Sequence, residues 1–196
     1  MKKILLIIFI LLLVFLIYYL NIDRKKYVLS IGDSTILNNI NLDEDIKKLY
    51  GKKLEKYVLY GNDGDYRIID LINDINNNKN FIYDSYKYTL DNVLIKADII
   101  IVSIGMNDLK YNKNNNNYDY IDEVINDLDK LFSIIRKYSK EKILVFNYYL
   151  DNDKLTRYVN SRLGKLVNKY KIDIIDYDND YSIINNNICE YLFKLY

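Results

Sequence analysis

Histidine is absent from this chain of 196 residues, and so are proline and tryptophan. The lack of histidine matters most for function, because histidine is the usual general base that activates a serine nucleophile. Any serine chemistry in this chain therefore needs another base or a histidine from a partner.

Cysteine is nearly absent, and the chain has no large excess of one charge. Cys189 stands alone, which excludes a disulfide within the chain and a metal site built from several cysteines. The chain has 28 Lys and Arg against 27 Asp and Glu, a net charge of +1, and its basic residues are scattered along the sequence. Such a balance does not indicate a nucleic acid partner.

Alanine is scarce too, Ala97 being the single one, whereas the chain has 22 tyrosines and many asparagines, isoleucines and lysines. We interpret this bias as the product of an AT-rich coding sequence. The asparagine tract at residues 112–118 then needs no special function, and a surface loop is expected there.

One long apolar run, residues 4–20, follows two lysines and precedes a short basic segment. As a helix the run would be about 25 Å long, at the short end of a bilayer span. An uncleaved anchor is favoured over a cleaved signal peptide, because no small residues mark a cleavage site. We therefore expect a single-pass membrane protein, with an anchor and basic linker in residues 1–26 and one domain in residues 27–196.

Within residues 27–196, apolar segments typical of buried strands alternate with segments of helical periodicity. The expected strands are residues 27–31, 56–60, 98–104, 142–148 and 172–176. The expected helices are residues 42–50, 66–75, 85–96, 120–138 and 153–170, with another at the C-terminus. This alternation predicts a three-layer α/β/α domain around a five-stranded parallel sheet, whose ligands bind at the carboxyl ends of the strands.

Three short polar motifs follow the first three of these strands. They are Gly32-Asp33-Ser34, Gly61-Asn62-Asp63-Gly64 and Gly105-Met106-Asn107-Asp108. Each alone is weak, because Gly, Asn and Asp are ordinary turn residues. Taken together and in this order, within VLSIGDST, GNDGDYRIIDL and ADIIIVSIGMNDL, they resemble the blocks of the SGNH, or GDSL, hydrolase family. The resemblance covers nearly all of residues 27–180 and implies a flavodoxin-like fold.

The same resemblance implies a serine ester hydrolase with Ser34 as its nucleophile. It assigns the oxyanion hole to the backbone N–H groups of Ser34 and Gly64 and to the side chain of Asn107. Fixed donors of this kind stabilise the negative charge that develops when an ester carbonyl is attacked.

Three charged residues near these motifs receive a structural interpretation. Asp33 and Asp108 are expected to fix their turns and not to act as acids or bases. Arg67 is expected on a solvated helix face, with contact to a substrate anion as the alternative.

The family's fourth motif, Asp-x-x-His at the start of the last helix, is where this chain departs from the pattern. The equivalent stretch is Asp180-Tyr181-Ser182-Ile183, so that Asp180 keeps the place of the orienting acid and Ile183 stands where the base is expected. Loss of the histidine alone lowers the turnover of a serine protease by roughly 10⁶-fold. Ser34 is thus a poor nucleophile unless a lysine or a partner's histidine activates it.

Two classes of function remain open on these grounds. One is a membrane-anchored hydrolase of acyl or acetyl esters in cell-envelope glycans or lipids, and the other is an inactive pseudoenzyme that binds a glycan or a protein at the membrane. A nucleotide binder is a third, weaker class, because GDSTIL offers a single glycine where a phosphate-binding loop needs several. No cofactor or metal is expected. The resemblance favours an extracytoplasmic position for the domain.

Overall fold

The computed structural model describes residues 2–22, 25–37, 41–111, 118–150, 152–177 and 181–194. Only the backbone is described for residues 2–5, 17–22, 111 and 181–185. Residues 112–117 of the predicted asparagine-rich loop lie outside the described residues.

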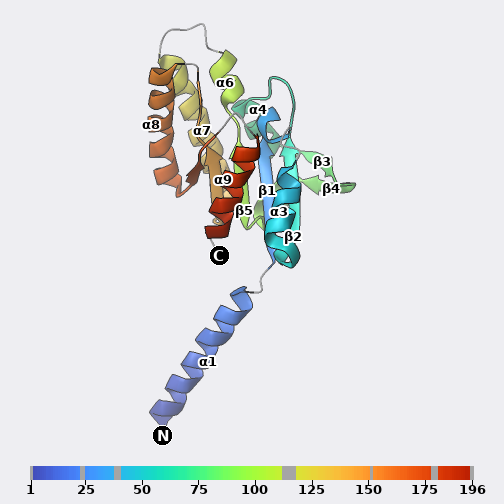
Figure 1. Ribbon diagram of the computed structural model, residues 1–196, viewed down its shortest axis with the longest axis vertical. Helices are drawn as coiled ribbons and strands as arrows, with labels where there is room; N and C mark the ends of the chain where they lie inside the picture. The colour runs from blue at the N-terminus through green and yellow to red at the C-terminus, as the bar shows by residue number, and fades with distance from the viewer. Residues whose placement is uncertain are drawn as a thin grey trace.

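A parallel sheet of five strands forms the centre of the domain, as the alternating pattern predicts (Figure 1). Its order is β2-β1-β5-β6-β7. The strands span β1 (Lys26–Gly32), β2 (Leu54–Gly61), β5 (Ile99–Ser103), β6 (Lys142–Phe146) and β7 (Asp173–Ile175). Numbered along the chain, the five strands follow the 2-1-3-4-5 order of flavodoxin-like folds. The prediction of a three-layer α/β/α domain is confirmed.

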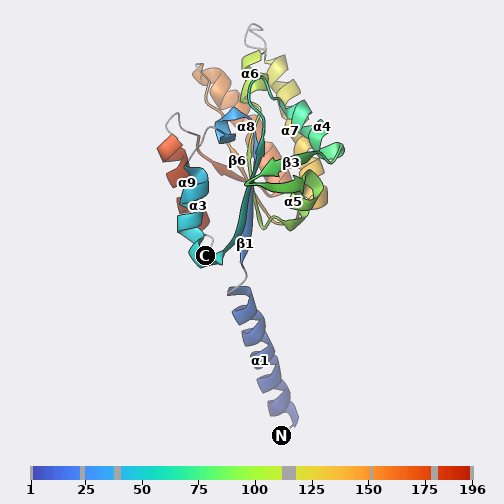
Figure 2. The same ribbon diagram turned by 90° about the vertical axis from the view of Figure 1, so that its right-hand side faces the viewer.

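Helices cover both faces of this sheet. In Figure 2, α3 (Leu42–Tyr50) and α9 (Tyr181–Lys194) lie on one side of the sheet. The helices of the other face are α4 (Ile68–Asn76), α5 (Leu90–Lys96), α7 (Asp119–Tyr138) and α8 (Asp153–Tyr170). The described part of the domain also has three short helical elements, namely α2 (Ser34–Leu37), η1 (Gly51–Lys53) and α6 (Met106–Tyr111).

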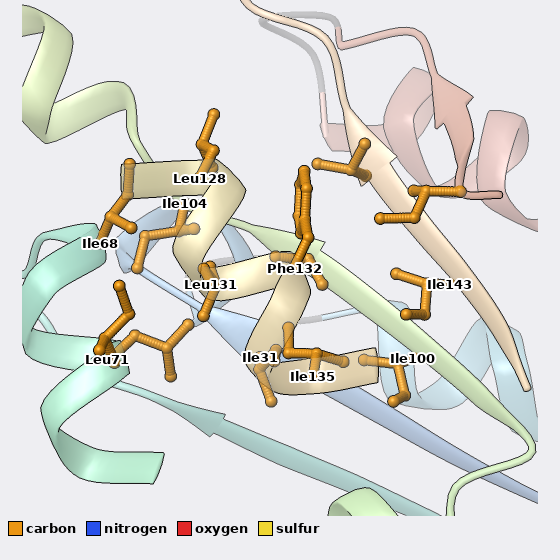
Figure 3. Packing of buried hydrophobic residues seen from close by; sticks show 14 of the residues in the cluster. Ile31, Ile68, Leu71, Ile100, Ile104, Leu128, Leu131, Phe132, Ile135 and Ile143 are labelled. Atoms are coloured by element: carbon orange, nitrogen blue, oxygen red, sulfur yellow. The ribbon is translucent and has the colours of Figure 1, made fainter. Parts of the chain in front are cut away.

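The apolar face of α7 supplies much of the packing against the sheet. Leu128, Leu131, Phe132 and Ile135 recur at helical spacing, and all four side chains are fully buried. Figure 3 shows them between the side chains of the sheet and those of α4. Each such side chain stabilises the fold by roughly 1.5–3 kcal/mol through removal from water, so this layer holds the strand ends in fixed positions.

A β-hairpin stands where the sequence predicts the start of a helix. Residues 85–96 are expected to be helical, but Tyr86–Thr89 form strand β4, which pairs with β3 (Asn80–Tyr83), and α5 begins only at Leu90. The turn residues Asp84 and Ser85 have φ angles of 50° and 63°. Positive φ at both central positions is the geometry of a tight type I′ hairpin turn, which stops the helix from extending backwards.

The N-terminal helix α1 (Lys2–Ile22) extends away from the domain in Figures 1 and 2. Side chains 6–16 of this helix are exposed apolar residues. Within the described part of the chain, no helix reaches the combination of length and apolar character that crossing a membrane requires. The predicted transmembrane helix is therefore not confirmed.

Candidate active site

The three sequence motifs meet at one edge of the sheet, because the strands they follow are neighbours. Gly32 at the end of β1 is paired with Gly61 of β2 on one side and with Ser103 of β5 on the other. Parallel strands end at the same edge, so the turns after β1, β2 and β5 lie side by side. The structure thus brings Ser34, Gly64 and Asn107 to the same edge.

Close backbone packing fixes the turn that carries Ser34. Gly32 has a φ of +158°, and a Cβ atom at this position would lie 1.8 Å from the carbonyl oxygen of Ser103. The Asp33 N–H donates to that same oxygen at 2.9 Å, and the Asp33 carbonyl accepts from the N–H of Ile36 at 3.1 Å. Glycine is therefore required at position 32 to bring β1 and β5 together at the start of α2.

Ser34 is the first residue of α2 and is half-buried. Among the side chains that the structure describes, none forms a hydrogen bond with the Ser34 hydroxyl. Asp180 lies outside the described residues, and Ile183 falls in the part of α9 where only the backbone is described. The predicted roles of Ser34 and Asp180 therefore remain predictions.

The carboxyl group of Asp33 is buried beneath this turn, with 1% of the residue exposed. One oxygen, Oδ1, accepts from the Thr35 N–H at 3.0 Å, whereas Oδ2 has no partner within the described residues. Burial raises the pKa of Asp33, against the opposing effects of the Thr35 hydrogen bonds and the charge of Lys110. The contact with Thr35 agrees with the interpretation of Asp33 as a residue that fixes its turn.

Asn107 binds the loop that carries Gly64. Its Nδ2 atom donates to the carbonyl oxygen of Gly64 at 2.9 Å and to that of Tyr66 at 3.0 Å. A primary amide has two N–H bonds, so both are in use. If the amide were rotated by half a turn, its Oδ1 would face the two carbonyl oxygens, and acceptors repel one another. The orientation of the side chain is therefore fixed. Donation from Asn107 to a substrate oxyanion requires one of these two hydrogen bonds to be exchanged.

Asp108 and Arg67 hold the start of α4. The Asp108 Oδ2 accepts from the Ile68 N–H at 3.2 Å, and the Asp70 Oδ2 accepts from the Arg67 N–H at 2.9 Å. Burial raises the pKa of Asp108, with the Ile68 hydrogen bond and the Arg67 charge acting in the opposite direction. The contact of Asp108 agrees with the structural role expected for it. The Arg67 side chain, which is partly exposed, pairs with Asp70 at 3.9 Å at the start of α4.

Tyr148, just after β6, supports the same edge and was missed by the sequence analysis. Its hydroxyl donates to the carbonyl oxygen of Ile104 at 2.8 Å. A Cβ at Gly105 would lie 2.6 Å from the Tyr148 hydroxyl oxygen. Burial raises the pKa of Tyr148, so the phenol is neutral under physiological conditions. A tyrosine after an apolar strand carries no signal by itself, because this chain has 22 tyrosines.

The interior of this edge is nearly filled. A hollow of about 10 Å³ lies beneath the Ser34 turn, lined among others by Asp33, Ser103, Asn147 and Tyr148. That space holds at most a water molecule. Among the described residues, no group of three or more His, Cys, Asp or Glu is placed to hold a metal ion.

No protein-family model matches this chain, and no curated protein matches its sequence. Solved structures do match it. The acetyl xylan esterase AlAXEase is 17% identical, with 86% of this chain and 82% of that chain covered and a TM-score of 0.56. A family 3 carbohydrate esterase from Talaromyces cellulolyticus is 16% identical, with 87% and 97% covered and a TM-score of 0.62.

A protein from Parabacteroides merdae described as a GDSL-like lipase is 10% identical, with 88% of this chain and 98% of that chain covered and a TM-score of 0.62. Identities this low establish likeness of fold and not of activity. The chain therefore has the fold of the GDSL-like lipases and carbohydrate esterases, the SGNH hydrolase fold.

Proposed function

We propose that this chain is a serine ester hydrolase that cleaves acyl or acetyl esters through Ser34. The observation that carries the proposal is the meeting of Ser34, Gly64 and Asn107 at the carboxyl edge of one sheet, in a fold shared with esterases. The strand order alone brings these three residues to the same edge of the sheet. Their meeting is therefore independent evidence, which does not rest on the sequence resemblance.

In the proposed reaction, the Ser34 Oγ attacks the ester carbonyl and the alcohol leaves, giving an acyl-enzyme that water then hydrolyses. The N–H groups of Ser34 and Gly64, with the Asn107 amide after one of its hydrogen bonds exchanges, are the proposed donors to the oxyanion. Asp180 is the proposed orienting acid. Because the chain has no histidine, turnover should lie far below that of an esterase with a complete triad, by up to about 10⁶-fold.

The proposed substrates are acetylated or acylated glycans, with lipid esters as the alternative. The name of one structural neighbour, an acetyl xylan esterase, supports the first class.

Attachment to a membrane through α1 is part of the proposal, with the domain on the extracytoplasmic side. Its support is the exposed apolar surface of residues 6–16, all of whose side chains are at least 47% exposed. A contiguous apolar surface of this kind is rarely left in water by a soluble protein. Flotation of the whole chain with lipid vesicles tests this part separately.

The second candidate is a pseudoenzyme that binds a glycan or a protein at the same edge. The observation in its favour is the absence of histidine from the sequence, together with an Asn107 amide already occupied by two carbonyl groups. A fluorophosphonate probe separates the candidates, because covalent labelling of Ser34 at an ordinary serine-hydrolase rate contradicts the pseudoenzyme.

The decisive experiment measures hydrolysis of a short-chain nitrophenyl ester by the whole chain and by two variants. Ser34→Ala should lose the activity entirely, whereas Ser161→Ala, an exposed position on α8, should keep it. Equal rates for the wild type and Ser34→Ala would contradict the proposed hydrolase.

A further inference from the structure

The edge of the sheet opposite Ser34 is rich in lysine. The strands begin there and the covering helices end there, so short loops from five parts of the chain come together. Six exposed lysines lie on these loops or in the helical turns that lead into them, and they define what we call the basic edge: Lys25, Lys52, Lys53, Lys96, Lys140 and Lys171.

These lysines have no carboxylate partner among the described residues, unlike Lys142 and Lys169, which pair with Asp173 and Asp129. The acidic residues on the same loops are Glu55, Glu141 and the largely buried Asp98, which accepts a hydrogen bond from the Tyr27 N–H. Among the described residues of this edge, positive charge therefore exceeds negative charge, although the whole chain carries only +1.

Helix ends explain part of this excess, because lysine near a helix C-terminus stabilises the helix dipole. Lys96, the last residue of α5, fits that explanation. Lys52 and Lys53 lie in η1 and Lys140 in the α7–β6 loop, beyond the last turn of an α-helix. Lys171, just after α8, adopts φ +53°, a left-handed conformation in which glycine or asparagine is favoured. The backbone at this position therefore does not explain why a lysine stands there.

Arg136 holds two of these loops together. Its guanidinium donates to the carbonyl oxygens of Tyr170 at 2.8 Å, Glu141 at 2.6 Å and Lys171 at 2.7 Å. The loops before β6 and β7 are thereby joined, and Lys140 and Lys171 line one hollow of about 540 Å³.

The position of α1 indicates which kind of partner the basic edge would face. Strand β1 begins at Lys26, shortly after the exposed apolar helix, and Figures 1 and 2 both show α1 leaving the domain at the edge where the strands begin. A membrane reached by α1 would lie on this side. Anionic lipid headgroups attract lysines close to a bilayer by about 1 kcal/mol each, or roughly fivefold in affinity.

We propose that the basic edge binds the anionic lipid headgroups of a membrane surface and orients the domain on it. The proposal extends the membrane attachment proposed above. The seven residues of β1 separate the two edges of the sheet by roughly 20 Å. Ser34 would then face away from the bilayer, toward esters of glycans outside the membrane and not toward lipids of the same membrane.

The test uses the whole chain with vesicles of phosphatidylcholine alone and of phosphatidylcholine mixed with phosphatidylglycerol. Flotation reports attachment, and a water-soluble acylating reagent followed by mass spectrometry reports the accessibility of each lysine. On anionic vesicles, acylation of Lys52, Lys53, Lys140 and Lys171 should slow by roughly fivefold, and high salt should abolish the protection. Lys154 at the start of α8 and Lys87 in the hairpin should react equally on both vesicles.

The possible outcomes separate this proposal from the attachment of α1. Flotation with both vesicles and equal lysine reactivity would overturn the basic edge and leave the attachment intact. Flotation with anionic vesicles alone, with protection, would support the basic edge and contradict the attachment. Flotation with neither would contradict both, and protection by soluble polyphosphate but not by vesicles would assign the edge to a soluble polyanion instead.

A charge variant provides a second readout. Replacing Lys52, Lys140 and Lys171 together by glutamine should remove most of the salt-sensitive part of binding to anionic vesicles. The matched replacement of Lys87, Lys154 and Lys165 should leave that binding unchanged. The same loss in both variants would mean that net charge alone, and not this edge, determines binding.

Discussion

The Nδ2 atom of Asn107 donates a hydrogen bond to the carbonyl oxygen of Gly64 at 2.9 Å. This bond joins helix α6, which follows β5, to the loop after β2, and a second bond from the same atom to Tyr66 strengthens the connection. Two of the three residues that the family resemblance assigns to the oxyanion hole are therefore linked directly. Their separation along the chain is 43 residues, so the fold alone brings them together.

Asn107→Asp should destabilise the protein at neutral pH by about 1–3 kcal/mol, because a carboxylate would face two carbonyl oxygens and leave them unpaired. Thermal unfolding measures the change. At acidic pH the protonated carboxyl group can donate one hydrogen bond, so part of the loss should be recovered. Asn126→Asp, at an exposed position on α7, is the control and should have little effect. Equal melting temperatures for Asn107→Asp and the wild type at pH 7 would contradict the role of these bonds.

Gly32→Ala should be among the most damaging substitutions in the chain. The added Cβ would lie 1.8 Å from the carbonyl oxygen of Ser103, and the backbone of β5 cannot yield without breaking the sheet. We expect a loss of at least about 3 kcal/mol in unfolding free energy or failure to fold.

Gly164→Ala is the matched control for that substitution. Position 164 lies inside α8, and a Cβ there meets no atom within 4 Å. Alanine should stabilise the helix by roughly 0.5–1 kcal/mol. Denaturant unfolding of the two variants should therefore give changes of opposite sign, and a destabilised Gly164→Ala would be the contrary result.

The hydrogen bonds of the Asp74 carboxylate should make the stability of the protein depend on pH. The carboxylate accepts from the hydroxyls of Tyr60 at 2.6 Å and Tyr66 at 2.7 Å and pairs with Lys79. Burial disfavours the charge of Asp74, but these hydrogen bonds outweigh burial and lower its pKa. A lowered folded pKa adds stability above the unfolded value of about 3.9, and this stability is lost as the pH falls through the folded pKa.

Asp74→Asn should therefore lower the unfolding free energy at pH 7 by about 1–3 kcal/mol, and the difference from the wild type should shrink at acidic pH. Melting curves across the range from pH 7 to about pH 3 measure both effects. Asp127→Asn, which breaks an exposed pair with Lys130, should cost less than about 1 kcal/mol. A difference between Asp74→Asn and the wild type that is independent of pH would contradict the proposed role of the charge.

Ile183→His tests whether a missing base limits the proposed esterase. The family pattern places the base at this position, three residues after Asp180, so the new histidine should raise nitrophenyl ester turnover by at least about tenfold. The gain should appear as the pH rises through roughly 6.5, where histidine becomes neutral and able to accept the serine proton. Ile184→His places the same side chain one position further along α9 and should give no such gain. Equal rates for the two variants would contradict the alignment.

Local pattern was sufficient for most elements of the fold. The continuous apolar run of β5 predicts a central strand, and the helical periodicity of residues 42–50 and 153–170 predicts α3 and α8 with the bounds that the structure has. The hairpin at β3 and β4 escaped prediction, because positive φ angles at Asp84 and Ser85 set it and neither residue requires them.

By itself the sequence determined the α/β alternation, the motif order and the absence of histidine, because periodicity and residue identity are local properties. Only the tertiary structure decided that both amide protons of Asn107 are occupied, since their acceptors lie more than 40 residues away. It also gathered lysines that look scattered in the sequence onto one edge. Parallel strands all begin at the same edge, so their loops bring together charges that are distant along the chain.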